Sequence, residues 1–191
     1  MPYLTTLADG STPSAIPLFN DVHHNFIVAN YAADGGCLDN DDGSAWYHIH
    51  HNFCVFGGAK TDFDGHEKQS WANLHIYPSV YGPKCYGMLQ GFPAAGFAEG
   101  YFGNTCVLQN AGEQVYSGGP DVKGLTPAAF ARVMVLGNNT IFAPSGSVGG
   151  PPGFATYQEF MAAGFDNTTT ISGDMPAAAT IVSWARALLF E

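Results

Sequence analysis

The feature that most constrains the fold of this chain is a four-residue pattern that occurs five times: an asparagine followed by three mostly apolar or β-branched residues. The gaps between successive asparagines are 27, 21, 31 and 35 residues. Repetition at a roughly constant interval is typical of solenoids, in which each coil adds one strand to a parallel sheet. Asparagine suits a sharp corner, and its amide can bond to equivalent amides in neighbouring coils. The five segments begin at Asn25, Asn52, Asn73, Asn104 and Asn139.

A second column of strands is expected after the asparagine-led strands. Cys37-Leu38-Asp39, Thr61-Asp62-Phe63 and Cys85-Tyr86-Gly87 each begin 9 to 12 residues after one of the repeated asparagines. Parallel strands joined by turns of this size, and stacked about 4.8 Å apart, form a β-helix. An α/β fold would need a crossover helix between parallel strands, and the connecting segments are too rich in Gly, Asp and Pro for that.

Helical signals are concentrated after residue 125. Thr126 and Pro127 suit the N-cap and first position of a short helix. The segment from Thr156 to Ala163 has Glu159 in place for a capping box with its first residue. Pro176 to Leu189 carries apolar residues at helical spacing. We therefore expect β-helix coils over residues 1–150 and a helical cap over residues 151–191.

Composition and charge restrict the partners. The chain of 191 residues has the size of one domain, and its 6 Lys and Arg against 16 Asp and Glu give a net charge of -10. So few cations argue against nucleic acid or an anionic membrane, whereas a neutral glycan suits such a surface. No apolar run reaches transmembrane length.

Several features fit a secreted glycoprotein. Lysine is scarce, aromatic residues are frequent, and Asn138-Asn139-Thr140 and Asn167-Thr168-Thr169 are glycosylation sequons. The first residues lack the regions of a signal peptide. A solenoid needs a cap on each end, and a candidate cap is seen only at the C-terminal end. We therefore expect the C-terminal part of a longer secreted solenoid, with its signal peptide outside this chain.

The four cysteines are expected to be buried free thiols. An even number of cysteines in a secreted chain usually indicates disulfides. The register of the expected coils, however, places Cys54 and Cys106 in one column and Cys37 and Cys85 in another, two coils apart in each case. Two strand spacings are about 9.6 Å, which is beyond the reach of a disulfide.

Two acidic segments on successive coils form the candidate site. Asp39-Asn40-Asp41-Asp42-Gly43-Ser44 is followed one coil later by the segment from Lys60 to Lys68. Two close carboxylates repel, which raises one pKa and can place a general acid beside a base. Oxygen-rich clusters also suit Ca²⁺, and Asp, Asn and Gly equally suit a turn that caps its own amides. Catalysis, Ca²⁺ binding and a simple turn therefore all stay open. The candidate catalytic residues are Asp39, Asp41, Asp62, Asp64, His66, Lys60 and Lys84, and the candidate Ca²⁺ ligands are Asp39, Asp41, Asp62 and Asp64.

The histidines allow a second hypothesis. His48 and His50 would lie on one face of a strand and, with an aspartate from a neighbouring coil, could bind a transition metal. Yet His24 and His51 each precede a repeated asparagine, and equivalent positions in a repeat favour a structural stack.

The asparagine-led strands, the segments Asp-Asn-Asp-Asp-Gly-Ser and Asp-Phe-Asp-Gly-His, and the ending Phe160-x-x-x-Gly164-Phe165-Asp166 resemble the right-handed parallel β-helix proteins of pectin-lyase-like architecture. The resemblance covers roughly residues 16 to 189 and extends to uncharacterised secreted members from microbial eukaryotes. It implies an all-β, right-handed parallel β-helix of about five coils with a C-terminal helical cap. The preference for right-handed crossovers agrees with this handedness.

The resemblance leaves the activity open. This architecture includes polysaccharide lyases, polygalacturonase-type hydrolases, epimerases, esterases and proteins that only bind. His66 would match the histidine of the hydrolases, but their tripeptides and their Arg-x-Lys motif are missing. Lys60, Lys68 and Lys84 are the candidate bases for a lyase, whose Ca²⁺ would be held by carboxylates. We expect a carbohydrate-active extracellular protein, a glycoside hydrolase or polysaccharide lyase, or alternatively a non-catalytic glycan-binding or adhesion module.

Overall fold

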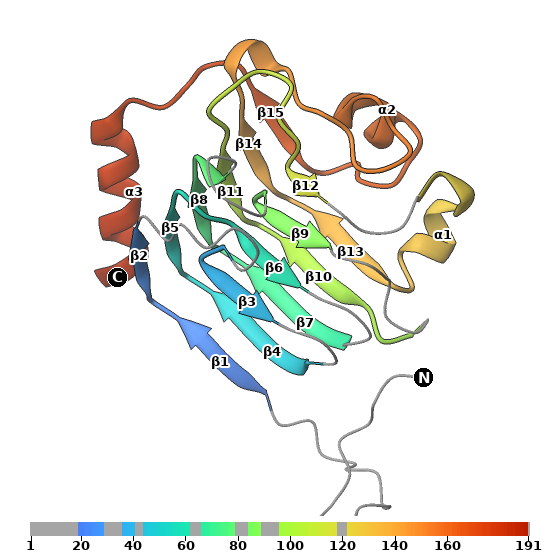
Figure 1. The fold of residues 1–191 in the computed structure, drawn as a ribbon, viewed down its shortest axis with the longest axis horizontal. Helices are drawn as coiled ribbons and strands as arrows, with labels where there is room; N and C mark the ends of the chain where they lie inside the picture. Colours follow the sequence, from blue (N-terminus) through green and yellow to red (C-terminus); the bar gives the residue numbers. More distant parts are fainter. Residues whose placement is uncertain are drawn as a thin grey trace, which may run out of the picture.

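The computed structural model describes residues 19–28, 36–40, 44–61, 66–78, 84–88, 96–117 and 122–190. Strands dominate it, and every pairing between the described strands is parallel (Figure 1). The structure therefore confirms an all-β fold built from parallel sheets. None of the described helices is both long enough and apolar enough to cross a membrane.

The strands form three sheets, and each sheet is ordered by sequence. Sheet 1 contains β1 (Asn20–His23), β4 (Ala45–His50), β7 (His66–Trp71), β10 (Glu99–Phe102) and β13 (Met134–Gly137). Sheet 2 contains β2 (Phe26–Val28), β5 (Phe53–Val55), β8 (Leu74–Ile76), β11 (Thr105–Val107), β14 (Thr140–Phe142) and β15 (Thr170–Ser172). Sheet 3 contains β3 (Leu38–Asn40), β6 (Ala59–Thr61), β9 (Tyr86–Met88) and β12 (Tyr116–Ser117). The chain thus visits sheets 1, 2 and 3 in turn and returns to the neighbouring strand of sheet 1.

The repeated asparagines form a continuous amide ladder between sheets 1 and 2, as the sequence predicts. Each side-chain amide donates a hydrogen bond to the side-chain oxygen of the next asparagine. These distances are 2.9 Å from Asn25 to Asn52, from Asn52 to Asn73 and from Asn73 to Asn104, and 3.3 Å from Asn104 to Asn139. From Asn52 to Asn139 the ladder is buried, so each amide satisfies its neighbours where water cannot.

The left-handed corner residue is the one that precedes each asparagine, rather than the asparagine itself. These five residues have φ between 51° and 65°. They are His24, His51, Ala72, Gly103 and Asn138. The left-handed backbone at this position, adopted by four non-glycine residues, indicates that the asparagine ladder holds the corner in place.

The second strand column is confirmed, with one correction. β3 and β9 lie within one residue of their predicted positions, but β6 covers Ala59–Thr61 and begins two residues before the predicted segment. Sheet 1 was not predicted as a column of its own. Its signal is the alternation of buried and partly buried residues, clearest in β7.

The helices begin close to the predicted residues. They are α1 (Pro127–Phe130), α2 (Tyr157–Ala162) and α3 (Ala178–Phe190), with the 3₁₀ turns Val122–Gly124 and Pro144–Gly146. Thr156 and Glu159 form the predicted capping box of α2. In Figure 1, α3 lies beside β2 and β5 of sheet 2, where Ile181 and Ala185 join an apolar cluster with strand residues of that sheet. β15 extends sheet 2 within the segment that was expected to be a helical cap.

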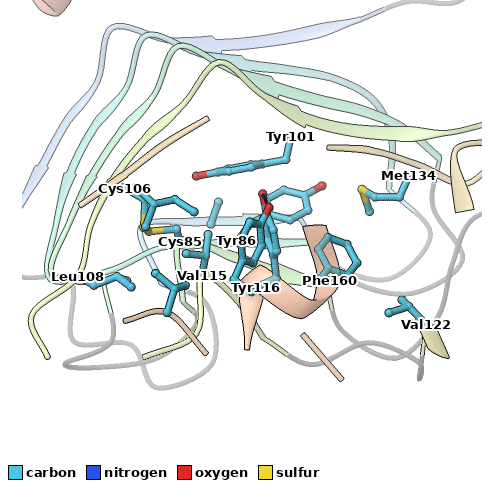
Figure 2. Close-up of a cluster of buried hydrophobic side chains, with 14 of the residues drawn as sticks. Cys85, Tyr86, Tyr101, Cys106, Leu108, Val115, Tyr116, Val122, Met134 and Phe160 are labelled. Atoms are coloured by element: carbon cyan, nitrogen blue, oxygen red, sulfur yellow. Dashed lines mark hydrogen bonds between the residues drawn. A yellow bond between two sulfur atoms is a disulfide. The ribbon is translucent and has the colours of Figure 1, made fainter. Parts of the chain in front are cut away.

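A buried cluster rich in tyrosine occupies the interior. The ring centroids of Tyr86 and Tyr101 are 4.6 Å apart, and those of Tyr101 and Tyr116 are 5.7 Å apart. Figure 2 shows these rings together, with the disulfide between Cys85 and Cys106 to one side. The cluster gives the sheets a common core.

This disulfide contradicts the prediction of four free thiols. The predicted column is correct, because Cys54 and Cys106 both pair with His75 in sheet 2. The prediction is wrong because Cys85, directly before β9 of sheet 3, faces Cys106 of sheet 2 across the interior, with 6.1 Å between their Cα atoms. Cys37 and Cys54 are buried and free.

Candidate functional site

The two sides of sheet 1 differ in chemistry, because successive side chains along a strand point to opposite faces. One set is buried in the interior, including Ile49, Ser70 and Tyr101. The other set forms two rows in register, which together we call the outer face of sheet 1. The first row is Asp21, His48, Gln69, Gly100 and Val135, and the second is His23, His50, Trp71, Phe102 and Gly137.

The second row contains a stack of four rings, His23, His50, Trp71 and Phe102, which we call the ring ladder. Successive ring centroids are 5.0, 4.6 and 6.1 Å apart, and the ring planes differ by 4°, 15° and 5°. His23 is exposed and the other three are partly exposed. Because neighbouring rings cover one another's faces, the ladder offers mainly ring edges and ring nitrogens to a partner.

Each histidine of the ring ladder also pairs with the histidine that follows it in the sequence. The Nδ1 atoms of His23 and His24 are 2.7 Å apart, and those of His50 and His51 are 2.8 Å apart. In each pair one imidazole must donate and the other accept, so at least one of the two is neutral. The rings of His24 and His51 also stack, with centroids 5.3 Å apart, which agrees with the expected structural stack.

These contacts favour uncharged imidazoles. Burial lowers the pKa of His50 below its usual value, and the neighbouring His51 lowers it further. Burial also lowers the pKa of His51, with a further contribution from His24. Neutral imidazoles both donate and accept hydrogen bonds. Among the described residues, no group of three or more His, Cys, Asp or Glu side chains is arranged to hold a metal ion.

The first row adds polar groups beside the ladder. The carboxylate of Asp21 lies 3.2 Å from His48 Nδ1 and 3.8 Å from His50 Nε2 and is about half exposed, at 53%. The amide of Gln69 donates to the Ala98 carbonyl at 2.9 Å. Its oxygen occupies the space where a Cβ of residue 100 would lie, so glycine at that position leaves room for the Gln69 side chain. The side chain of Gln69 therefore lies over Gly100 on this face.

The predicted acidic site is described only in part. β3 and β6 align Asp39 with Lys60, and the carboxylate lies 3.1 Å from the ammonium. Asp39 is 43% exposed, whereas Lys60 is nearly buried. The described strand partner of Asp39 is therefore a lysine. Asp41, Asp62 and Asp64 lie outside the described residues, so the convergence of four carboxylates and the Ca²⁺ site stay predictions.

The remaining candidates lie apart from the ring ladder. His66 is completely buried, and its ring packs edge-on against Trp46 and Phe97, at centroid distances of 5.3 and 5.2 Å. Lys84 is partly buried and directly precedes Cys85. A buried imidazole between aromatic rings has the surroundings of a core residue.

An interior ion pair was not predicted from the sequence. Lys68 of β7 and Glu99 of β10 are 2.9 Å apart, and both side chains are almost fully buried. Burial raises the pKa of Glu99, and the charge of Lys68 opposes that rise. The alternation along β7 places Lys68 on the interior face. This alternation is the one feature of the sequence that could have indicated a buried lysine.

The chain was compared with known protein families, curated proteins and solved structures. A scan against protein-family models, a search of curated proteins and a search of solved structures each found no match. Any functional conclusion therefore rests on the side chains described above.

Proposed function

We propose that this chain belongs to an extracellular, right-handed parallel β-helix of about five coils that binds glycan without cleaving it. The binding surface is the outer face of sheet 1. The observation that carries the proposal is the ring ladder, which runs in register across four strands beside the carboxylate of Asp21 and the amide of Gln69.

The order of the strands supports the β-helix. Each passage of the chain through sheets 1, 2 and 3 is one coil, and the return to sheet 1 is a parallel crossover. Such crossovers are right-handed in almost all proteins. All three strands of one coil, β4, β5 and β6, and the turns that join them lie within the described residues 44–61.

The chemistry of the outer face suits sugar hydroxyls, which both donate and accept hydrogen bonds. The ring nitrogens of His48 and His50 can form such hydrogen bonds, and Asp21 accepts. The edges of Trp71 and Phe102 supply apolar contact for the carbon-bound hydrogens of a sugar ring. The four rungs span roughly 14 Å, three strand spacings, which is enough for a short run of sugar residues. The net charge of -10 disfavours a polyanionic glycan.

An extracellular location is supported by two observations. The disulfide between Cys85 and Cys106 is typical of proteins made in an oxidising compartment. The acceptor residues of both sequons, Asn138 and Asn167, are exposed, as N-glycosylation requires.

Cleavage of a polysaccharide at the acidic segments is the second candidate. It is favoured by the exposed carboxylate of Asp39 next to Lys60, since a lysine beside a carboxylate can act as a base or as an acid in elimination. Here the substrate would lie along sheet 3, whereas the first proposal uses sheet 1.

A panel of neutral and acidic algal polysaccharides distinguishes the two. The protein is passed over immobilised glycans, and the same glycans are incubated with it and analysed for products. We expect retention by a neutral glycan, no unsaturated product and no new reducing ends. Unsaturated product would establish a lyase and new reducing ends a hydrolase, and either result would overturn the non-catalytic proposal. Absence of retention by every glycan would also overturn it.

A further inference from the structure

Cys37 and Cys54 occupy the same positions in the fold as the two cysteines of the disulfide. Cys37 directly precedes β3 and Cys85 directly precedes β9, and the first residues of these strands align through Ala59 of β6. Cys54 is the middle residue of β5 and Cys106 is the middle residue of β11. The two cysteine pairs therefore occupy equivalent positions that lie two strands apart along sheets 2 and 3.

The position between the two pairs holds no cysteine. Gly58 precedes β6, and His75 is the middle residue of β8. The equivalent positions thus alternate along the stack, with a pair of cysteines, then a glycine and a histidine, then a second pair of cysteines. The disulfide bridges sheets 2 and 3 with 6.1 Å between the Cα atoms, a separation within the range that disulfides adopt without strain.

The first pair of thiols is already in contact. Cys37 and Cys54 are both buried. A hydrogen bond with Cys37 raises the pKa of the Cys54 thiol, and burial raises it further. The sulfur of Cys37 also lies against Gly57, at a position where a Cβ on that glycine would approach it to 2.9 Å. The glycine therefore keeps room for sulfur on the inner side of the chain.

We propose that Cys37 and Cys54 form a second disulfide between sheets 3 and 2 in the mature protein. The oxidant is a disulfide of the glutathione or disulfide-isomerase class, acting by thiol–disulfide exchange. The Cys37 thiolate attacks that disulfide and releases one thiolate. The Cys54 thiolate then attacks the mixed disulfide at the Cys37 sulfur and releases the second. The protons of the two protein thiols go to the released thiolates, so two thiols are oxidised and one disulfide is reduced.

The timing follows from the burial. The thiolate is the reacting form, and a buried thiol with a raised pKa reacts slowly. The bond therefore forms during folding, before the interior closes, and not in the finished protein. The proposal needs an oxidising environment, but it does not depend on glycan binding.

Refolding the whole chain tests it. The reduced, unfolded protein is refolded with reduced and oxidised glutathione, unfolded again without reductant, alkylated with N-ethylmaleimide, and analysed by intact mass and peptide mapping. We expect no label, and linked peptides that join Cys37 to Cys54 and Cys85 to Cys106. Two labels, on Cys37 and Cys54, would overturn the proposal, and so would a link from Cys37 to any other cysteine.

A variant isolates the new bond. In Cys85→Ser/Cys106→Ser the proposed bond is the only one that can form, and reductant should lower the melting temperature by roughly 5 to 10 °C. The matched control adds Cys37→Ser, which leaves one labelled thiol and no effect of reductant. No effect of reductant on the parent variant would also overturn the proposal. If this variant does not fold, the peptide map of the natural sequence decides.

Discussion

Lys68 and Glu99 form an ion pair of 2.9 Å inside the protein, on neighbouring strands of sheet 1. A buried pair contributes little compared with apolar residues of the same volume, but removing one partner leaves an uncompensated charge. We therefore predict that Lys68→Met lowers the free energy of unfolding by about 3 to 5 kcal/mol.

The loss should depend on pH in a definite direction. Burial already raises the pKa of Glu99, and without Lys68 the largest influence that opposes that rise is gone. A group with a raised pKa stabilises the fold at low pH and loses that contribution as pH increases. Urea unfolding of Lys68→Met should therefore show a larger loss at pH 8 than at pH 5. Lys68→Met/Glu99→Leu, which has neither charge, should recover most of the loss, and a double variant as unstable as the single one would contradict this explanation.

His75 makes the fold sensitive to acid. It is completely buried, burial lowers its pKa to about 4, and neither ring nitrogen has a hydrogen-bond partner in the described part of the chain. The unfolded chain, with a pKa near 6.5, binds a proton first as pH falls, so stability is lost between pH 6.5 and 4. The expected loss from this residue is about 3 kcal/mol by pH 4.

His75→Leu tests this loss directly. It replaces the imidazole by an apolar side chain of similar size, so the variant should lose less stability than the natural protein between pH 7 and pH 4.5 in urea titrations. Equal losses in the two proteins would show that His75 is not the sensitive group.

The asparagine ladder should be most sensitive at its centre. Asn73 accepts hydrogen bonds from the backbone and side-chain amides of Asn52 at 3.0 and 2.9 Å, and donates to Asn104 at 2.9 Å. Asn73→Ala leaves the buried backbone N–H of Asn52 without its partner and removes the bond to Asn104, which should cost about 3 kcal/mol of unfolding free energy. Asn25→Ala, at the exposed end of the described ladder, is the matched control and should cost about 1 kcal/mol or less. Equal losses in denaturant titrations would contradict the cooperative ladder.

The asparagine ladder was predictable because one residue type recurs at one position of every repeat. The strands of sheet 1 have no such shared residue: Glu99-Gly100-Tyr101-Phe102 and the strand that begins at His66 have little in common beyond alternation. Only the pairing of these strands in the structure shows that they belong to one sheet. This is why the ring ladder, whose members are 21 to 31 residues apart, was missed.

The error over the cysteines has a geometric cause. Spacing along the sequence predicts which residues share a column, and it did so for Cys54 and Cys106. It does not give the distance between columns of different sheets, which depends on how those sheets pack. Cys85 and Cys106 meet across that gap. The acidic candidates show the same limit. The sequence does not reveal that β6 begins at Ala59, and this start is what pairs Lys60 with Asp39 across the two strands.

The most direct measurement of the proposed glycan site compares affinities of variants on two different sheets. With a glycan that the natural protein retains, Trp71→Ala should weaken binding at least about tenfold, because it removes the centre of the ring ladder. Asp39→Asn, on sheet 3, and Met175→Ala, an exposed residue before α3, should bind as the natural protein does. Unchanged affinity in Trp71→Ala together with a tenfold loss in Asp39→Asn would contradict the account and place the glycan at the acidic segments instead.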